Sequence, residues 1–349
     1  AQLFGLLLMQ GTLISTVFGT LWAVLVRYGD DGPPLPPNGI WALWGILWLW
    51  VALAQTLTLL RGTPRKALAL TFAALLVAIG IVENLSGQGT AWVADAGAAA
   101  ERSRPAQLAV TQELLEAQPK LLADRLDAIA AQRPGVVDLY ALTFAPYAHE
   151  DVFRRESQMV SDVLAARFDT AGRSLQLVNH VDSVGDWPWA TPLNLKRAIE
   201  RVAALMDRDE DILFIHLTSH GAQDGALAAQ FWPLTVGPVT PQELKSWLDE
   251  AGIRHRVVSV SACYSGSWIA PLSDDHTLVM TAADSENTSF GCGRKSELTY
   301  FGRAVYDEQL RLHTRSFVEA HAAARPLIEQ RERAAGKDDG YSNPQIAAG

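Results

Sequence analysis

The sequence predicts an α/β domain, with a mostly parallel sheet flanked by helices, that follows an all-α transmembrane segment. Two observations support this fold class. Apolar runs long enough to span a bilayer are confined to residues 1–83. From Gly135 onward, short apolar runs alternate with amphipathic stretches, a pattern typical of a parallel sheet covered by helices. We therefore divide the chain into three transmembrane helices at 1–83, a helical stalk at 84–134 and a domain at 135–349.

Three apolar runs, at residues 3–26, 40–60 and 67–82, make up the first part. A spanning helix needs about 20 apolar residues, with about 17 as the lower limit. The third run is long enough if Lys66 and Glu83 extend their charges toward the interface. A cleaved signal peptide is the alternative for the first run, but no basic stretch precedes it and two more runs follow. We expect the lipid bilayer to be a partner through these three helices.

The loops between the runs predict the orientation of the chain. Residues 61–66 are basic, whereas residues 28–39 are acidic and rich in proline. Basic loops stay preferentially in the cytoplasm, so the third helix would carry everything after Glu83 to the other side. In the stalk, residues 106–118 and 120–132 predict two helices separated at Pro119. An inhibitory segment lying across an active site is the alternative to a stalk.

The domain from Gly135 alternates strands and helices. Thr191 before Pro192, and Thr240 three residues before Glu243, are N-cap signatures that begin two of the helices. We predict strands at 136–144, 174–179, 211–218, 256–262 and 277–282, and helices at 152–168, 193–206, 241–251, 300–310 and 316–333.

Charge and cysteine content exclude two classes of protein. A net charge of −9 argues against nucleic acid as a partner, because phosphate binding requires a basic surface. The two cysteines, Cys263 and Cys292, exclude a disulfide-rich scaffold but leave one bridge between them open. The oligomeric state is left open as well.

Two of the predicted strands end in residues that carry chemistry. Residues 256–262 lead into Cys263, and residues 211–218 lead into Ser219-His220-Gly221. The carboxyl ends of strands in an open α/β sheet border the crevice where ligands bind. A free thiol has a pKa of about 8.5 and needs a base or a positive charge to act as a nucleophile at neutral pH. The pattern therefore predicts a pair in which His220 activates Cys263.

The N–H groups of Gly221 and Cys263 are expected to form an oxyanion hole. His216 lies about 13 Å from His220 along a strand, too far to share a metal, and is interpreted as a packed residue. The alternative for the pair is a buried, inert Cys263 and a loop histidine. A disulfide to Cys292 would also silence the thiol.

Residues 219–221 and 262–267, joined by an apolar strand, resemble the C13 (legumain-like) family of cysteine peptidases in the caspase-like superfamily. Residues 281–292 resemble the family's loop that walls the substrate pocket, and 147–152 its loop after the first strand. The resemblance implies a caspase-like fold, Cys263 as nucleophile, His220 as general base and acid, a protein or peptide substrate, and no metal or organic cofactor. The residues it places in the substrate pocket are His149, Tyr264, Ser285, Thr288, Ser289 and Arg294.

With the apolar runs, the resemblance indicates a membrane-anchored bacterial-type member, in the inner membrane with the catalytic domain on the periplasmic side. The leading hypothesis is an endopeptidase acting through a thioester. A transamidase or ligase using the same pair, and an inactive peptidase-like binding module, are the alternatives. Tyr264 and Arg294-Lys295 stand where asparagine-cutting members of the family carry acidic residues, so we expect a preference for an acidic side chain rather than asparagine. Zymogen activation is left open.

Overall fold

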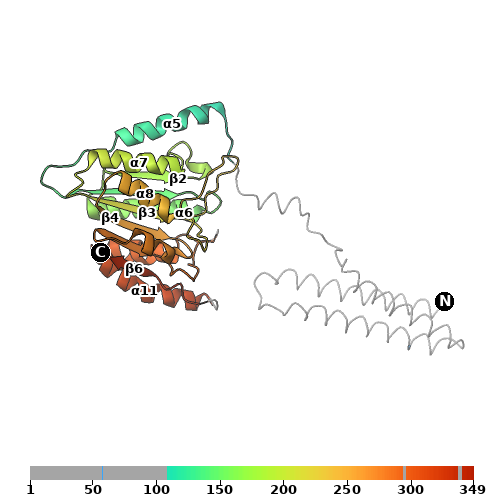
Figure 1. Cartoon of the computed structure of the whole chain (residues 1–349). Coiled ribbons are helices and arrows are strands. Elements are labelled where there is room, and N and C mark those ends of the chain that lie inside the picture. The colour runs from blue at the N-terminus through green and yellow to red at the C-terminus, as the bar shows by residue number, and fades with distance from the viewer. Residues whose placement is uncertain (1–56, 58–107, 294–295, 337–339) are drawn as a thin grey trace, which may run out of the picture. The chain divides into compact units, whose positions relative to one another are not determined.

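The computed structural model of the chain describes Leu57 and residues 108–293, 296–336 and 340–349 (Figure 1). The chain divides into two compact units, Ala1–Arg102 and Ser103–Gly349. The three predicted transmembrane helices lie outside the described residues, apart from Leu57, which is helical. Among the described residues, no helix combines the length and apolar character needed to cross a bilayer.

The unit Ser103–Gly349 is built on a six-stranded sheet with the strand order β2-β1-β3-β4-β5-β6. The first five strands pair in parallel, and β6 pairs antiparallel to β5. Their bounds are Leu139–Ala145 for β1, Ser174–Val178 for β2, Ile212–Thr218 for β3, His255–Ser261 for β4, Thr277–Thr281 for β5 and Gln345–Ala348 for β6. The fold is thus the predicted α/β class with a mostly parallel sheet.

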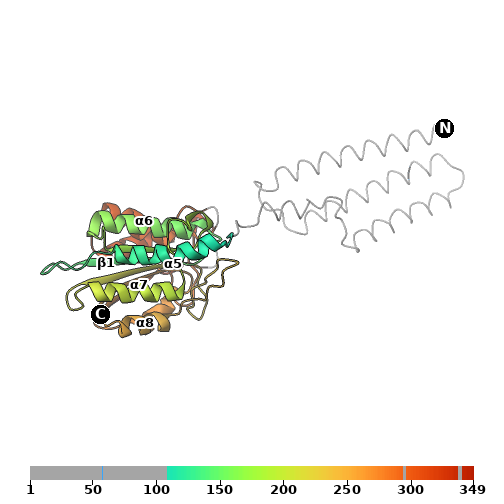
Figure 2. The same cartoon turned by 90° about the horizontal axis from the view of Figure 1, so that it is seen from above.

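Helices cover both faces of the sheet (Figure 2). On one face, Phe214 of β3 and Met280 of β5 pack against the helices α6, α10, η3 and α11. On the other, Ile215 and Val258 pack against α5, α7 and α8. The bounds are Gln112–Asp127 for α5, Asp151–Phe168 for α6, Pro192–Leu205 for α7, Pro241–Glu250 for α8, Ile269–Leu272 for α9, Tyr300–Gly302 for α10, Arg303–Leu310 for η3 and Phe317–Ala334 for α11. Neighbouring residues of a strand point to opposite faces of the sheet. Because consecutive residues of β3 and β4 are buried, both faces of these strands are covered.

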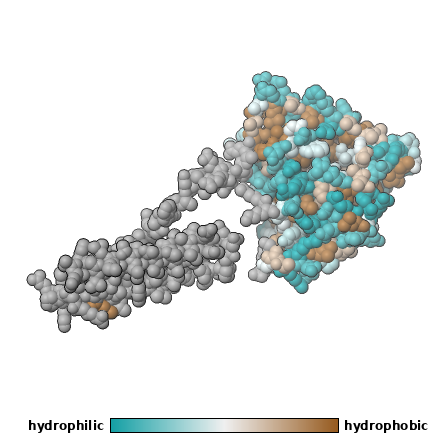
Figure 3. Space-filling model, turned by 180° about the vertical axis from the view of Figure 1, so that it is seen from behind, coloured by the Kyte–Doolittle hydropathy of each residue, from teal (hydrophilic) through white to brown (hydrophobic). Residues whose placement is uncertain are grey.

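The strands and helices predicted for the domain from Gly135 occur in the structure, including two predicted helix starts. The Thr191 hydroxyl accepts a hydrogen bond from the Asn194 N–H at 3.2 Å. Thr240 and Glu243 form a complete capping box. The region predicted as one helix at 300–310 begins with a short α-turn and continues as the π-helix η3. On the face shown in Figure 3, the described surface is mostly hydrophilic with small scattered apolar patches, as expected when the sheet is covered on both sides.

The expected break at Pro119 is wrong, because α5 runs continuously through this residue. The lost backbone hydrogen bond costs about 3 kcal/mol, and tertiary contacts offset it. Leu122 is buried against the core, and the Gln118 amide donates to the Val184 carbonyl at 2.7 Å and accepts from the Trp189 N–H at 2.9 Å. The helix also ends earlier than predicted, at Asp127. A stalk was expected here, but the described part of this segment packs against the sheet domain.

Candidate active site

The carboxyl ends of β3 and β4 bring the predicted thiol and imidazole segments together. The two strands are direct neighbours, with Thr218 paired to Ser261. Cys263 and His220 each follow their strand by two residues, so both lie at the same edge of the sheet. A Cβ atom on Gly221 would lie 2.0 Å from the Cys263 carbonyl oxygen. The two segments are therefore in backbone contact, and only glycine fits at position 221.

The sulfur of Cys263 lies in a partly buried environment rich in hydrogen-bond donors. The Ser289 N–H donates to Sγ at 3.3 Å, and the Ser289 hydroxyl lies 3.8 Å from it. The pKa of Cys263 is lowered to about 6, mainly by a side-chain hydrogen bond with Cys292. Burial opposes this shift, whereas the hydrogen bonds from Ser289 and the positive charge of His220 add to it. At neutral pH the thiolate is therefore the favoured form, as a cysteine nucleophile requires.

Cys292 is a neighbour of this sulfur and not its disulfide partner. Both cysteines are free thiols. The hydrogen bond with Cys263 and burial together raise the pKa of Cys292, so this thiol keeps its proton and can donate it to the Cys263 thiolate. The bridge that the sequence left open is not formed in this structure.

The imidazole of His220 is held by three side chains, two from the segment between β1 and α6 and one from the first turn of α6. Its Nε2 lies 3.4 Å from Oε2 of Glu150. The rings of Tyr147 and Phe153 pack edge-on against it, with centroids at 4.7 and 5.1 Å. The side chain keeps 35% of its surface exposed, so the ring is fixed in position but accessible.

The backbone around the pair leaves two amides for a ligand. Within the described residues, neither the Gly221 N–H nor the Cys263 N–H donates a hydrogen bond, whereas the flanking amides of Ser219 and Tyr264 donate to Ser261 and Asn287. Tyr264 has a φ of 55°, in the left-handed region that is uncommon for residues with a side chain. This conformation turns the chain sharply after Cys263, as expected where a nucleophile is presented at a strand end.

Residues 193–347 match the Peptidase C13 family. This stretch includes Cys263, His220 and the loop after β5, and it covers less than half of the chain. No curated protein matches the chain. Among solved structures, caspase-1 from Spodoptera frugiperda is similar with a TM-score of 0.43 and 14% identity over 63% of this chain and 94% of its own. The structure of pro-sf-caspase-1 matches with a TM-score of 0.41 and 14% identity, over 70% of this chain and 95% of its own.

Of the residues predicted for the substrate pocket, two lie at Cys263 or its turn, three lie in the surrounding loops, and one is outside the described residues. Ser289 contacts the sulfur directly, and Tyr264 joins the Cys263 turn to the loop after β5 through Asn287. Ser285 is exposed in that loop, Thr288 is half-buried there, and the ring of His149 packs against Tyr147 at 5.8 Å. Arg294 lies outside the described residues.

Sequence reasoning missed a buried network beneath the site. Glu156 of α6 is fully buried and accepts hydrogen bonds from Nε2 of His216 at 3.2 Å and from the Thr299 N–H at 3.1 Å. Burial alone would raise the pKa of Glu156, but the hydrogen bond and charge of His216 outweigh it and lower the pKa. His216 is therefore a packed residue, as interpreted from the sequence. Val152, Glu156 and Val160 are spaced four residues apart and lie on one buried face of α6. This helical spacing could have indicated from the sequence that Glu156 is buried.

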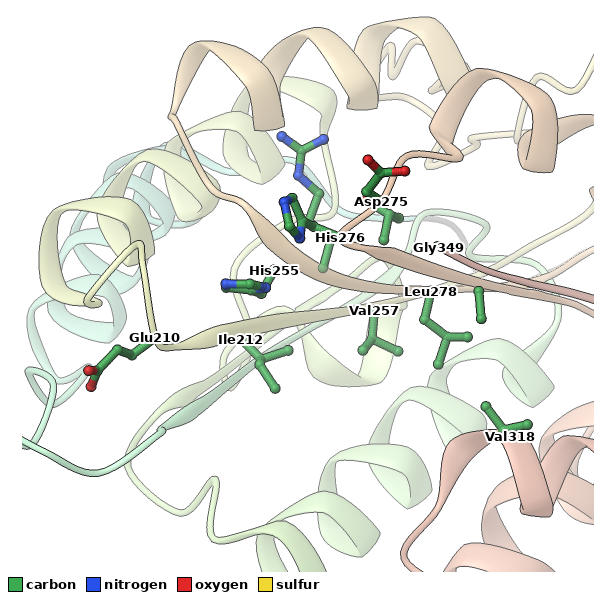
Figure 4. A pocket seen from close by; sticks show the side chains of 12 residues that line it. Glu210, Ile212, His255, Val257, Asp275, His276, Leu278, Val318 and Gly349 are labelled. Carbon is green, nitrogen blue, oxygen red and sulfur yellow. The ribbon is translucent and has the colours of Figure 1, made fainter.

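A pocket lies at the opposite edge of the sheet, where the parallel strands begin (Figure 4). It is lined by the first residues of β3, β4 and β5, Ile212, His255 and Thr277, and by His276. The rings of His255 and His276 stand 5.2 Å apart. However, no group of three metal-ligating side chains occurs in the part of the chain that the structure describes. This pocket contains no thiol and is separate from the Cys263 edge.

Proposed function

We propose that this protein is a membrane-anchored cysteine endopeptidase of the C13 type, in which Cys263 and His220 hydrolyse peptide bonds through a thioester. The family match supports a cysteine peptidase acting on protein or peptide. The observation that carries the proposal is the backbone contact between Gly221 and Cys263, which brings the segments of His220 and Cys263 together at one edge of the sheet. Hydrogen bonds there lower the pKa of the Cys263 thiol to about 6. A buried structural cysteine in apolar surroundings would have a raised pKa instead.

The proposed reaction uses the thiol, the imidazole and two backbone N–H groups that follow β3 and β4. The Cys263 thiolate attacks the carbonyl carbon of the scissile bond, and the N–H groups of Gly221 and Cys263 stabilise the resulting oxyanion. The imidazolium of His220 donates its proton to the leaving amine, and the C–N bond breaks to leave a thioester. His220 then removes a proton from water, which attacks the thioester and releases the acid and the thiolate.

Membrane anchoring is part of the proposal and rests on the sequence. The apolar runs at 3–26, 40–60 and 67–82 would hold the chain in a bacterial inner membrane, with the catalytic domain on the periplasmic side. Alkaline phosphatase fused after Gly135 tests the orientation, since this reporter is active only outside the cytoplasm. Activity is expected from this fusion, and a signal only from a matched cytoplasmic reporter would contradict the orientation.

Peptide cleavage by the full chain in detergent tests the activity. A peptide mixture analysed by mass spectrometry should show new termini with the parent chain and none with Cys263→Ala or His220→Ala. His255→Ala is the matched control, because it removes a histidine from the opposite edge of the sheet. Cleavage that persists in Cys263→Ala would refute the proposed nucleophile.

A further inference from the structure

Glu156 of α6 holds a buried carboxylate against which three parts of the chain meet. The residue is fully buried, and its Oε1 lies 3.2 Å from Nε2 of His216 in β3. Its Oε2 accepts hydrogen bonds from the N–H of Thr299, at 3.1 Å, and from the hydroxyl of the same residue. A Cβ atom on Gly302 would lie 2.2 Å from this Oε2. The helix that begins at Tyr300 therefore packs directly against the carboxylate.

The directions of these hydrogen bonds extend the network to the strand that leads into the nucleophile. An ionised carboxylate only accepts hydrogen bonds, so the Thr299 hydroxyl gives its one proton to Glu156. The Thr299 oxygen accepts from the Gly302 N–H at 2.9 Å, and the Ser261 hydroxyl, 3.1 Å away, then donates to it as well. Ser261 is the last residue of β4, two residues before Cys263. Glu156 is thus connected through Thr299 to the end of β4.

The helix start at Tyr300 also holds segment 289–292, which lies against the sulfur. The Tyr300 N–H donates to the Phe290 carbonyl at 3.1 Å. A Cβ atom on Gly291 would lie 2.8 Å from the same backbone nitrogen, and Gly291 has a φ of 85°, so only glycine fits there. The Ser289 N–H donates to the sulfur at 3.3 Å. The buried carboxylate is therefore connected to both the strand and the loop that surround the nucleophile.

A buried charge is a costly way to stabilise a core. Removing charged groups from water is unfavourable, and apolar side chains of similar volume often stabilise a core equally well or better. A network of buried hydrogen bonds differs from apolar packing because it joins particular atoms at set distances, and it makes the core rigid in one arrangement. The network around Glu156 therefore defines where segment 289–292 lies relative to β4.

We infer that Glu156 is a positioning residue for the nucleophile, which holds segment 289–292 where the Ser289 N–H reaches the Cys263 sulfur. The inference rests on the proposed function. Glu156 acts through Thr299 and takes no part in breaking or forming bonds. The hydroxyl of Thr299 is therefore as necessary for this role as the carboxylate.

Two substitutions break the network at different points. Glu156→Leu keeps a side chain of similar volume but makes no hydrogen bond, and Thr299→Val removes only the hydroxyl. Thr299→Ser is the matched control for the second variant, because it keeps the hydroxyl. Ser157→Ala is the control for lost stability, since it removes a buried hydroxyl of the same helix that lies 2.7 Å from Thr143 and has no printed link to Thr299 in the network.

The pH at which Cys263 reacts with iodoacetamide reports whether segment 289–292 still reaches the sulfur. The pKa of this thiol is lowered to about 6, chiefly by the hydrogen bond with Cys292 and, against the effect of burial, further by Ser289. Both residues belong to the segment. If the segment shifts, these hydrogen bonds weaken, and the midpoint of alkylation moves to higher pH. The measurement uses the full chain in detergent, with mass spectrometry as the readout.

We expect the midpoint to rise by about one unit or more in Glu156→Leu and in Thr299→Val. It should stay near 6 in Thr299→Ser and in Ser157→Ala. A role in stability alone would lower the free energy of unfolding in these variants without moving the midpoint. The inference is overturned if Glu156→Leu or Thr299→Val folds, as judged by circular dichroism, and keeps the parent's midpoint. Failure of both variants to fold would assign the network to the fold rather than to the site, and would overturn it too.

Cys263→Ala, assayed for peptide cleavage in parallel, keeps this inference distinct from the proposed function. If Cys263→Ala still cleaves peptides, the proposed nucleophile fails. If it is inactive while Thr299→Val keeps the parent's midpoint of alkylation, only the role of Glu156 fails.

Discussion

Removing the thiol of Cys292 should weaken the nucleophile without touching the dyad. A hydrogen bond with Cys292 is the largest cause of the lowered pKa of Cys263. With this pKa at about 6, about 90% of Cys263 is thiolate at pH 7. A hydrogen bond to a charged group contributes about 1.5–3 kcal/mol, or about one to two pKa units. In Cys292→Ala, the thiolate fraction at pH 7 should therefore fall to about 10–50%.

The rate of alkylation of Cys263 by iodoacetamide, followed by mass spectrometry across pH 4–10, measures this fraction. The parent chain should show a midpoint near 6, with the reactive form lost as the pH falls below it. Cys292→Ala should move the midpoint upward by about one to two units, and Cys292→Ser should restore part of the shift because a hydroxyl can still donate. An unchanged midpoint in Cys292→Ala would refute the reasoning that Cys292 stabilises the thiolate.

Three further predictions concern the oxyanion hole, the buried network and specificity. Gly221→Ala should lower kcat/KM by about a hundredfold or more, because the added Cβ would lie 2.0 Å from the Cys263 carbonyl oxygen; a fully active variant would contradict this packing. Glu156→Ala should lower the free energy of unfolding by about 3–5 kcal/mol in a urea titration, since it leaves His216 and Thr299 without their partner. The exposed Glu297→Gln is its control, with an expected change within about 0.5 kcal/mol, and equal stabilities would contradict the role of the network. Peptides with Asp before the cleaved bond should be cut faster than matched Asn and Ala peptides, and equal rates would remove the proposed acidic preference.

The parts of the fold that follow from local patterns could be predicted from the sequence. The β-branched run before Ala262 and the apolar run before Ser219 each form a strand, and the caps at Thr191 and Thr240 begin helices as expected. Since parallel neighbours end at one edge, the backbone contact between Gly221 and Cys263 followed from the same patterns.

Features that depend on tertiary contacts could not be predicted in this way. Strand β6 has little apolar pattern of its own and forms because its backbone pairs with β5. Continuity of α5 through Pro119 depends on the contacts of Gln118 and Leu122 with the domain. Glu150 reads as an ordinary acid at a helix start, and only the packed structure shows that its carboxylate faces His220 rather than the helix N-terminus.

The central claim, that Cys263 is a nucleophile activated by His220, is tested most directly by covalent labelling of the full chain. A peptide acyloxymethyl ketone forms a stable thioether with an activated thiolate, and peptide mapping identifies the modified residue. The account predicts a single adduct on Cys263, its loss in Cys263→Ala, and labelling at least about tenfold slower in His220→Ala. Labelling of Cys292 instead of Cys263, or labelling of Cys263 at an unchanged rate in His220→Ala, would contradict it.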